Sequence, residues 1–263
     1  MSTFPYAVTD SATMLRRRLR HLLRYPSMTV MLAGMPIVFL LLFVYVFGGT
    51  LGAGLGAVSG SRADYVDYVT PGILLAAVAA VAQGTAIAVA MDMTEGIIAR
   101  FRTMAIARVS VLTGHVLGAM IQTMLSVAMT IAVALLVGFR PTAGLADWVA
   151  TFGVLAMAAL ALTWLSVALG MATNSVEMAS NLPMPLMLLP FLGSGFVPTD
   201  SMPAGLRWFA EHQPFTPIMD TLRGLLMGTP IGDSGTLAVA WCAAIGLGGY
   251  VWAKRLFDRD PTP

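Results

Sequence analysis

The stretch MTVMLAGMPIVFLLLFVYVF, residues 28–47, decides the class of fold, because none of its 20 positions carries a charge. It lies within an uncharged run of 37 residues, 25–61, and roughly 17–25 apolar residues suffice to cross a bilayer as a helix. The apolar core of a secretion signal is shorter, at about 7–15 residues. We therefore interpret this stretch as a retained membrane span.

Five further uncharged runs follow along the chain. They are 24, 31, 29, 22 and 20 residues long and cover 68–91, 109–139, 148–176, 178–199 and 234–253. Overall, 57% of the residues are hydrophobic and 11% are charged, against roughly 25% charged in a soluble domain. A soluble core of this size cannot bury so much apolar surface. The sequence thus predicts an all-α integral membrane protein with six transmembrane helices.

Local signals place the ends of these spans. We expect spans at 27–47, 71–91, 181–197 and 236–253, and two more within 111–137 and 148–172. Pro71 suits the first turn of the second helix, since proline lacks the N–H that helix interiors need. The glycine-rich residues 48–60 are expected to form an irregular outer loop, and 173–180 an inner turn. All of residues 1–263 then form one domain, with spans inside 27–253 and a polar tail at 254–263.

The basic residues predict the orientation. With both termini in the cytoplasm, inner segments hold eleven Lys and Arg residues and outer segments hold four, namely Arg62, Arg140, Arg207 and Arg223. Short cytoplasmic loops of membrane proteins carry such an excess of positive charge. Because the basic residues follow the membrane edges, the net charge of +2 indicates topology and no nucleic-acid surface.

Two inner segments have an amphipathic pattern. Residues 10–24 place leucines on one helical face and arginines on another, which is typical of a helix lying on the membrane surface; a simple positive anchor is the alternative. In the inner loop 92–110, Ile97, Phe101 and Met104 share one helical face. We expect a short surface helix there, exposed to a cytoplasmic partner.

The fifth span and the segment after it are unusual. Prolines and glycines interrupt the span, at Pro183, Pro185, Pro190, Gly193, Gly195 and Pro198. Such a helix is kinked or broken, and its freed carbonyls need partners on neighbouring helices or in a water-lined cavity. The next outer segment, 199–233, is too apolar for a loop in water. We interpret it as one or two re-entrant or interfacial helices.

The residues of enzyme and metal sites are missing from the sequence. The histidines are scattered at positions 21, 115 and 212, and no zinc motif is present, so we predict no metal site. Ser194 lacks a later histidine base within a span. The only lysine, Lys254, is in no phosphate-binding loop, so any energy from ATP must come from a partner chain. These features favour a transport subunit over an enzyme.

Two sets of residues resemble a known family. The loop EGIIARFRTM, residues 95–104, followed by Gly114 and His115, resembles the first cytoplasmic loop of ABC-2-type transporter permeases, where Lys usually stands in place of His115. The elements SGFVP (194–198), MP (202–203), PFTPI (214–218) and LRGL (222–225) are similar to the family's ending of span five and its outer segment. Within this family, the chain looks most like the daunorubicin-resistance membrane subunits.

The resemblance implies a permease in the bacterial plasma membrane. It would pair with a second permease copy or a paralogue and with two ATPase subunits, which bind ATP and Mg; this chain would bind no cofactor. Residues 1–26 would contain the family's elbow helix, and 199–233 the re-entrant gate region. The residues of the coupling helix to the ATPase would be Glu95, Ile97, Arg100, Phe101, Arg102 and Met104. The cargo would be a hydrophobic drug, a lipid or a polyketide-like molecule.

Five residues are candidates for a gate or cavity: Gln83, Gln122, Pro190, Phe215 and Arg223. Pro190 interrupts span five, and Phe215 and Arg223 belong to the second set of family-like residues. Gln83 and Gln122 are polar residues within spans, and a hydrogen bond to a neighbouring helix is their alternative role. An ATP-independent channel, a secondary transporter or a membrane scaffold is the alternative function.

Overall fold

The computed structural model describes residues 26–54, 61–95, 108–173 and 175–258, with side chains from 33 and 113 onward in the first and third ranges. These residues form helices and no strand, which confirms the all-α prediction. The expected elbow helix and five of the six coupling residues, Ile97 to Met104, lie outside the described residues. Glu95 lies inside them and ends helix α4, where its N–H donates to the Met91 carbonyl.

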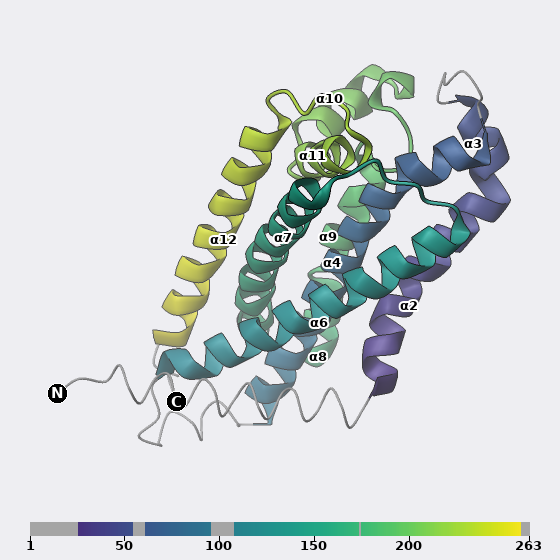
Figure 1. Ribbon diagram of the computed structural model, residues 1–263. Coiled ribbons are helices and arrows are strands. Elements are labelled where there is room, and N and C mark those ends of the chain that lie inside the picture. The colour runs from purple at the N-terminus through teal and green to yellow at the C-terminus, as the bar shows by residue number, and fades with distance from the viewer. Residues whose placement is uncertain (1–25, 55–60, 96–107, 174, 259–263) are drawn as a thin grey trace.

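Among the described residues, five helices are long and apolar enough to cross a membrane. The first continues from α2 (Pro26–Leu42) through a π-helical turn, η1 (Phe43–Phe47), into α3 (Gly48–Gly54). The others are α4 (Arg62–Thr94), α6 (Arg108–Val137), α7 (Leu145–Ala172) and α12 (Ser234–Asp258). In Figure 1 they cross the molecule from one end to the other. We call these the α10 end, where α4, α7 and α12 begin, and the α8 end, where they finish.

Two predicted boundaries are wrong. Helix α4 begins at Arg62, so Pro71 lies inside the helix and not in its first turn. The cause is a capping box: the Asp64 N–H donates to Ser61 Oγ at 3.3 Å, and the Ser61 N–H donates to Asp64 Oδ2 at 3.0 Å. Residues 48–54, expected in an irregular loop, are helical because the first helix runs on through its π-helical turn.

The interrupted fifth segment is confirmed. It consists of α8 (Val176–Asn181), α9 (Met184–Leu188) and a 3₁₀ helix, η2 (Leu189–Leu192). Pro183 separates α8 from α9, and Pro190 lies in η2. The segment starts earlier than expected, because Ser175 caps α8 by accepting from the Met178 N–H at 3.2 Å. All three pieces pack against α4.

The outer segment, interpreted from the sequence as one or two re-entrant or interfacial helices, contains two helices, α10 (Ala204–His212) and α11 (Phe215–Met227), after a 3₁₀ turn, η3 (Thr199–Ser201). Helix α11 packs against α4, α7 and α12, and nine of its 13 residues are buried. Helix α10 lies outside the bundle, and Ala210 is its one buried residue.

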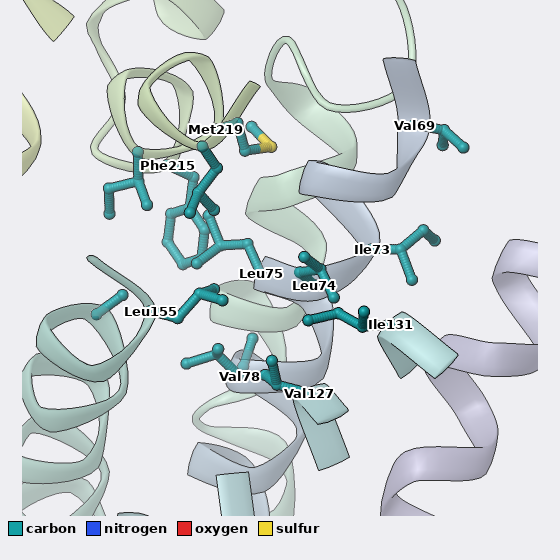
Figure 2. Packing of buried hydrophobic residues seen from close by; sticks show 14 of the residues in the cluster. Val69, Ile73, Leu74, Leu75, Val78, Val127, Ile131, Leu155, Phe215 and Met219 are labelled. Carbon is teal, nitrogen blue, oxygen red and sulfur yellow. The ribbon is translucent and has the colours of Figure 1, made fainter. Parts of the chain in front are cut away.

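Helix α4 is the centre of the core, and 20 of its residues are buried. Figure 2 shows Leu74, Leu75 and Val78 of α4 surrounded by side chains of α6, α7 and α11, which include Ile131, Leu155, Phe215 and Met219. A second apolar cluster joins α4, α6, α7 and α12 toward the α8 end, through Val89, Val116, Val167, Ala253 and Phe257. Burial of apolar area of this kind holds the central helix against its neighbours.

Candidate functional site

A cluster of polar side chains lies at the α10 end, between α4, α11 and the irregular residues 193–197. Its centre is Arg223 of α11, whose side chain is 17% exposed. Arg223 Nη1 donates to Asp220 Oδ1 at 2.7 Å, and Nη2 donates to the Ser194 carbonyl at 2.7 Å. The guanidinium carbon lies 4.1 Å from the ring centroid of Tyr68, a cation–π distance.

Ser194 joins the cluster through both its side chain and its backbone. Its hydroxyl donates to Asp220 Oδ1 at 2.7 Å, and its carbonyl accepts the Tyr68 hydroxyl at 2.8 Å as well as Arg223. The Tyr65 hydroxyl donates to the Phe196 carbonyl at 3.3 Å. We use the name polar cluster for Tyr68, Ser194, Asp220 and Arg223. It ties residues 193–197 to two helices that are distant in sequence.

Glycine allows this close approach. A Cβ added to Gly72 of α4 would lie 2.8 Å from the Gly195 carbonyl oxygen, and one added to Gly195 would lie 2.5 Å from Met219 Sδ. A Cβ at Gly193 would collide with Gln213, Thr216 and Met219. Residues 193–197 therefore fit against α4 and α11 only because positions 72, 193 and 195 carry no side chain.

Aromatic rings before and within this segment pack against one another and against the first helix. Phe191 and Phe196 stack with centroids 4.4 Å apart, and Phe43 lies 4.7 Å from Phe196. Phe39 meets the edge of Phe191 at 5.3 Å. Phe43 belongs to η1, and π-helical turns frequently occur at functional sites. The segment thus takes part in both the polar cluster and a group of packed aromatic rings.

The structure separates the five gate candidates. Arg223 is in the polar cluster, whereas Phe215 is buried in the apolar core on α11 and Pro190 is buried in η2. Gln83 is not at this site: its amide Nε2 donates to the Ser180 carbonyl at 2.9 Å, the interhelical role that was its alternative. Gln122 lies half-buried on α6 and takes no part in the hydrogen bonds of the cluster.

Sequence reasoning missed Tyr68 and Asp220. Asp220 precedes Arg223 by three positions, a spacing that places opposite charges on one helical face. Tyr68 lies outside the second span expected from the sequence, which starts at Pro71, whereas in the structure it lies about two turns inside α4. A capping-box search at Ser61 and Asp64 finds the true start.

A pair of ionisable side chains lies toward the α8 end. His115 of α6 is buried, and its Nε2 lies 2.9 Å from Asp92 Oδ2 of α4. The pair joins the two helices on either side of residues 96–107. Within the part of the chain that the structure describes, no group of three or more His, Cys, Asp or Glu residues is arranged for a metal ion.

Comparisons with known proteins point to one family. Residues 10–227 match the model of the family described as ABC-2 type transporter. The chain is 28% identical over 225 residues to the daunorubicin resistance ABC transporter permease protein DrrB1 of Streptomyces coeruleorubidus, covering 85% of this chain and 77% of that protein. It is 24% identical over 174 residues to the probable doxorubicin resistance ABC transporter permease protein DrrC of Mycobacterium tuberculosis, covering 65% and 63%.

Proposed function

This chain belongs to the ABC-2 type transporter family, and from that premise we propose that it is the permease subunit of an exporter driven by a separate ATPase. Membership and the five long apolar helices make it a multi-pass membrane permease subunit. The observation that carries the proposal is the family match over residues 10–227, together with relatives named as drug-resistance permeases.

The proposed complex contains two permeases and two ATPase subunits, with ATP and Mg on the latter. The contact to each ATPase would be the coupling segment, residues 95–104. Its apolar residues Ile97, Phe101 and Met104 would fill a groove, and Glu95, Arg100 and Arg102 would fix the register at the rim. Residues 10–24 would form the elbow helix on the same side of the membrane.

Helix α4 gives this arrangement a mechanical basis. Its 33 residues form one unbroken helix. Tyr65 and Tyr68 lie in its first two turns, and Glu95, where the coupling segment begins, caps its other end. At 1.5 Å per residue, the helix is about 50 Å long. A displacement of the coupling segment would therefore move α4 as a rod and shift Tyr68 in the polar cluster. We propose that the polar cluster is the closed gate on the outer side.

The cargo proposed is a hydrophobic or amphipathic molecule. The relatives are named for resistance to daunorubicin and doxorubicin. Four phenylalanines belong to the segments next to the proposed gate, and their rings offer apolar and stacking contacts: Phe39, Phe43, Phe191 and Phe196. Drugs, lipids and polyketide-like molecules share this chemistry.

The test is assembly and stimulation of the ATPase encoded nearest to this chain. We expect the two proteins to co-purify, and Phe101→Ala to weaken association by about 2 kcal/mol or more, because buried aromatic anchors dominate such contacts. Phe152→Ala, on the exposed side of α7, is the matched control and should bind normally. If Phe101→Ala binds the ATPase normally and shows normal cargo-stimulated hydrolysis, the coupling role is disproved. If the wild-type proteins do not associate, an ATP-independent channel or scaffold is favoured.

A further inference from the structure

The carbonyl of Ser194 is held by donors from two different helices. The Tyr68 hydroxyl comes from α4, at 2.8 Å, and Arg223 Nη2 comes from α11, at 2.7 Å. Both bonds can exist together only while α4 and α11 keep their present spacing. The carbonyl is therefore sensitive to any relative motion of these helices.

The same residues close a ring of hydrogen bonds. Asp220 Oδ1 accepts from both Ser194 Oγ and Arg223 Nη1, each at 2.7 Å, so the ring runs from Ser194 through Asp220 and Arg223 back to Ser194. Within it, the charges of Arg223 and Asp220 compensate each other. Hydrogen bonds of this kind are stronger in a surrounding of low dielectric constant than in water.

One donor in the ring remains unused. Arg223 Nε is buried, and none of the described residues supplies it with a hydrogen-bond acceptor. An unpaired buried donor costs free energy, and the cost is recovered when the side chain moves to water or to a new acceptor. Four short hydrogen bonds thus stabilise the closed arrangement, and one unpaired N–H destabilises it. This balance lowers the free energy needed to open the contact, as a contact that opens repeatedly requires.

We propose that Tyr68 and Arg223 form a latch that holds residues 193–197 against α4 and α11 and keeps the pathway closed at the α10 end. The gating role rests on the proposed permease function, whereas the latch itself is a property of this chain alone. A shift of α4 relative to α11 breaks at least one of the two bonds to the Ser194 carbonyl and weakens the hold on the segment. Residues 193–197 are then free to move away from Gly72 and from Met219.

A cysteine behind the segment reports this opening directly. Met219 is fully buried, and its sulfur fills the space where a side chain of Gly195 would lie. In a Cys242→Ser background, Met219→Cys reacts with a polar maleimide only when residues 193–197 lift from α11. The protein is placed in lipid nanodiscs without any ATPase, so both faces are accessible and the rate of labelling measures the open fraction.

We expect Tyr68→Phe to raise the labelling rate at position 219 about fivefold, the factor expected for the loss of one ordinary hydrogen bond. The variant keeps the aromatic ring and its contact with Arg223. Arg223→Gln should raise the rate by more, because it removes the bonds to both Ser194 and Asp220. Tyr250→Phe on the exposed side of α12 is the matched control and should leave the rate unchanged.

An exposed cysteine at Gly205→Cys, where no atom lies within 4 Å of an added Cβ, corrects for general loosening. Labelling at 219 that stays within twofold of the parent in both Tyr68→Phe and Arg223→Gln overturns the latch, as does an equal rise at 205. A rise at 219 in a chain that binds no ATPase supports the latch and rejects the proposed function, so the two failures are distinct.

Discussion

Small residues bring α12 into close contact with α7. A Cβ added to Gly249 would lie 2.6 Å from the Leu165 backbone nitrogen and 2.8 Å from the Trp164 carbonyl carbon. Gly246 lies one turn earlier against Ala161, and Cys242 is buried a further turn back on the same face. Helices in lipid gain little from excluding apolar surface, so close backbone packing supplies much of their attraction.

Gly249→Ala should therefore destabilise the protein by about 1–3 kcal/mol, the usual cost of overpacking, because the methyl group meets backbone atoms that cannot move aside. The neighbouring Gly248→Ala should have no such effect, since nothing lies within 4 Å of its added Cβ. Thermal unfolding is followed with a dye that becomes fluorescent on reaction with the Cys242 thiol. Equal melting temperatures for the two variants would show that α7 and α12 accommodate the added methyl group without loss of stability.

At the scale of elements, α10 has little support from the described part of the molecule, since Ala210 is its one buried residue. Trp208 is 64% exposed, and Leu206 and Phe209 are also exposed. Arg207 lies on the opposite face, where it pairs with Asp200 and Glu211. A short helix with aromatic residues on one face and ion pairs on the other is typical of the membrane–water boundary.

We expect Trp208 to lie at the level of the lipid headgroups. The measurement uses a single-tryptophan variant in which the other four are replaced by Phe, reconstituted with brominated lipids. Bromine near the headgroup should quench Trp208 more strongly than bromine near the chain end. A variant that keeps only Trp241 of α12 should show the reverse order. Absence of quenching at Trp208 by either lipid would place α10 in water.

The elements that the sequence predicts well are those with strong local signals. Uncharged runs identified all five long helices, and the prolines of 183–198 identified the broken segment. Pro71 indicates the wrong start for the second helix, because a single proline inside a 33-residue helix costs one hydrogen bond, which the packing of 20 buried residues outweighs. The polar cluster was found only in part, because the Ser194 carbonyl, a backbone group, is its main acceptor.

The whole molecule constrains the number of membrane crossings. Helix α2 begins at the α8 end, and α12 finishes there as well, so the chain crosses from end to end an even number of times (Figure 1). Five helices are long enough to cross alone. The broken segment, residues 176–192, lies between α7 and α10 and begins at the opposite end from α10. We propose that it is the sixth span, shorter than the others and supported by α4.

The layout predicts the side on which single cysteines are labelled. In a Cys242→Ser background, we expect an impermeant maleimide added to intact cells to reach Gly205→Cys at once, and Glu177→Cys and Asp258→Cys only after permeabilisation. All three positions are exposed in the structure, so burial does not confuse the result. The sequence places an excess of Lys and Arg in the segments that precede α2, join α4 to α6 and follow α12, and this excess favours the α8 end inside. Positions 177 and 205 decide whether the broken segment crosses the membrane, because it is the one candidate span between them. Labelling of both from the same side would mean that this segment does not cross and that five spans remain. In that case, positions 177 and 258 would be labelled from opposite sides of the membrane.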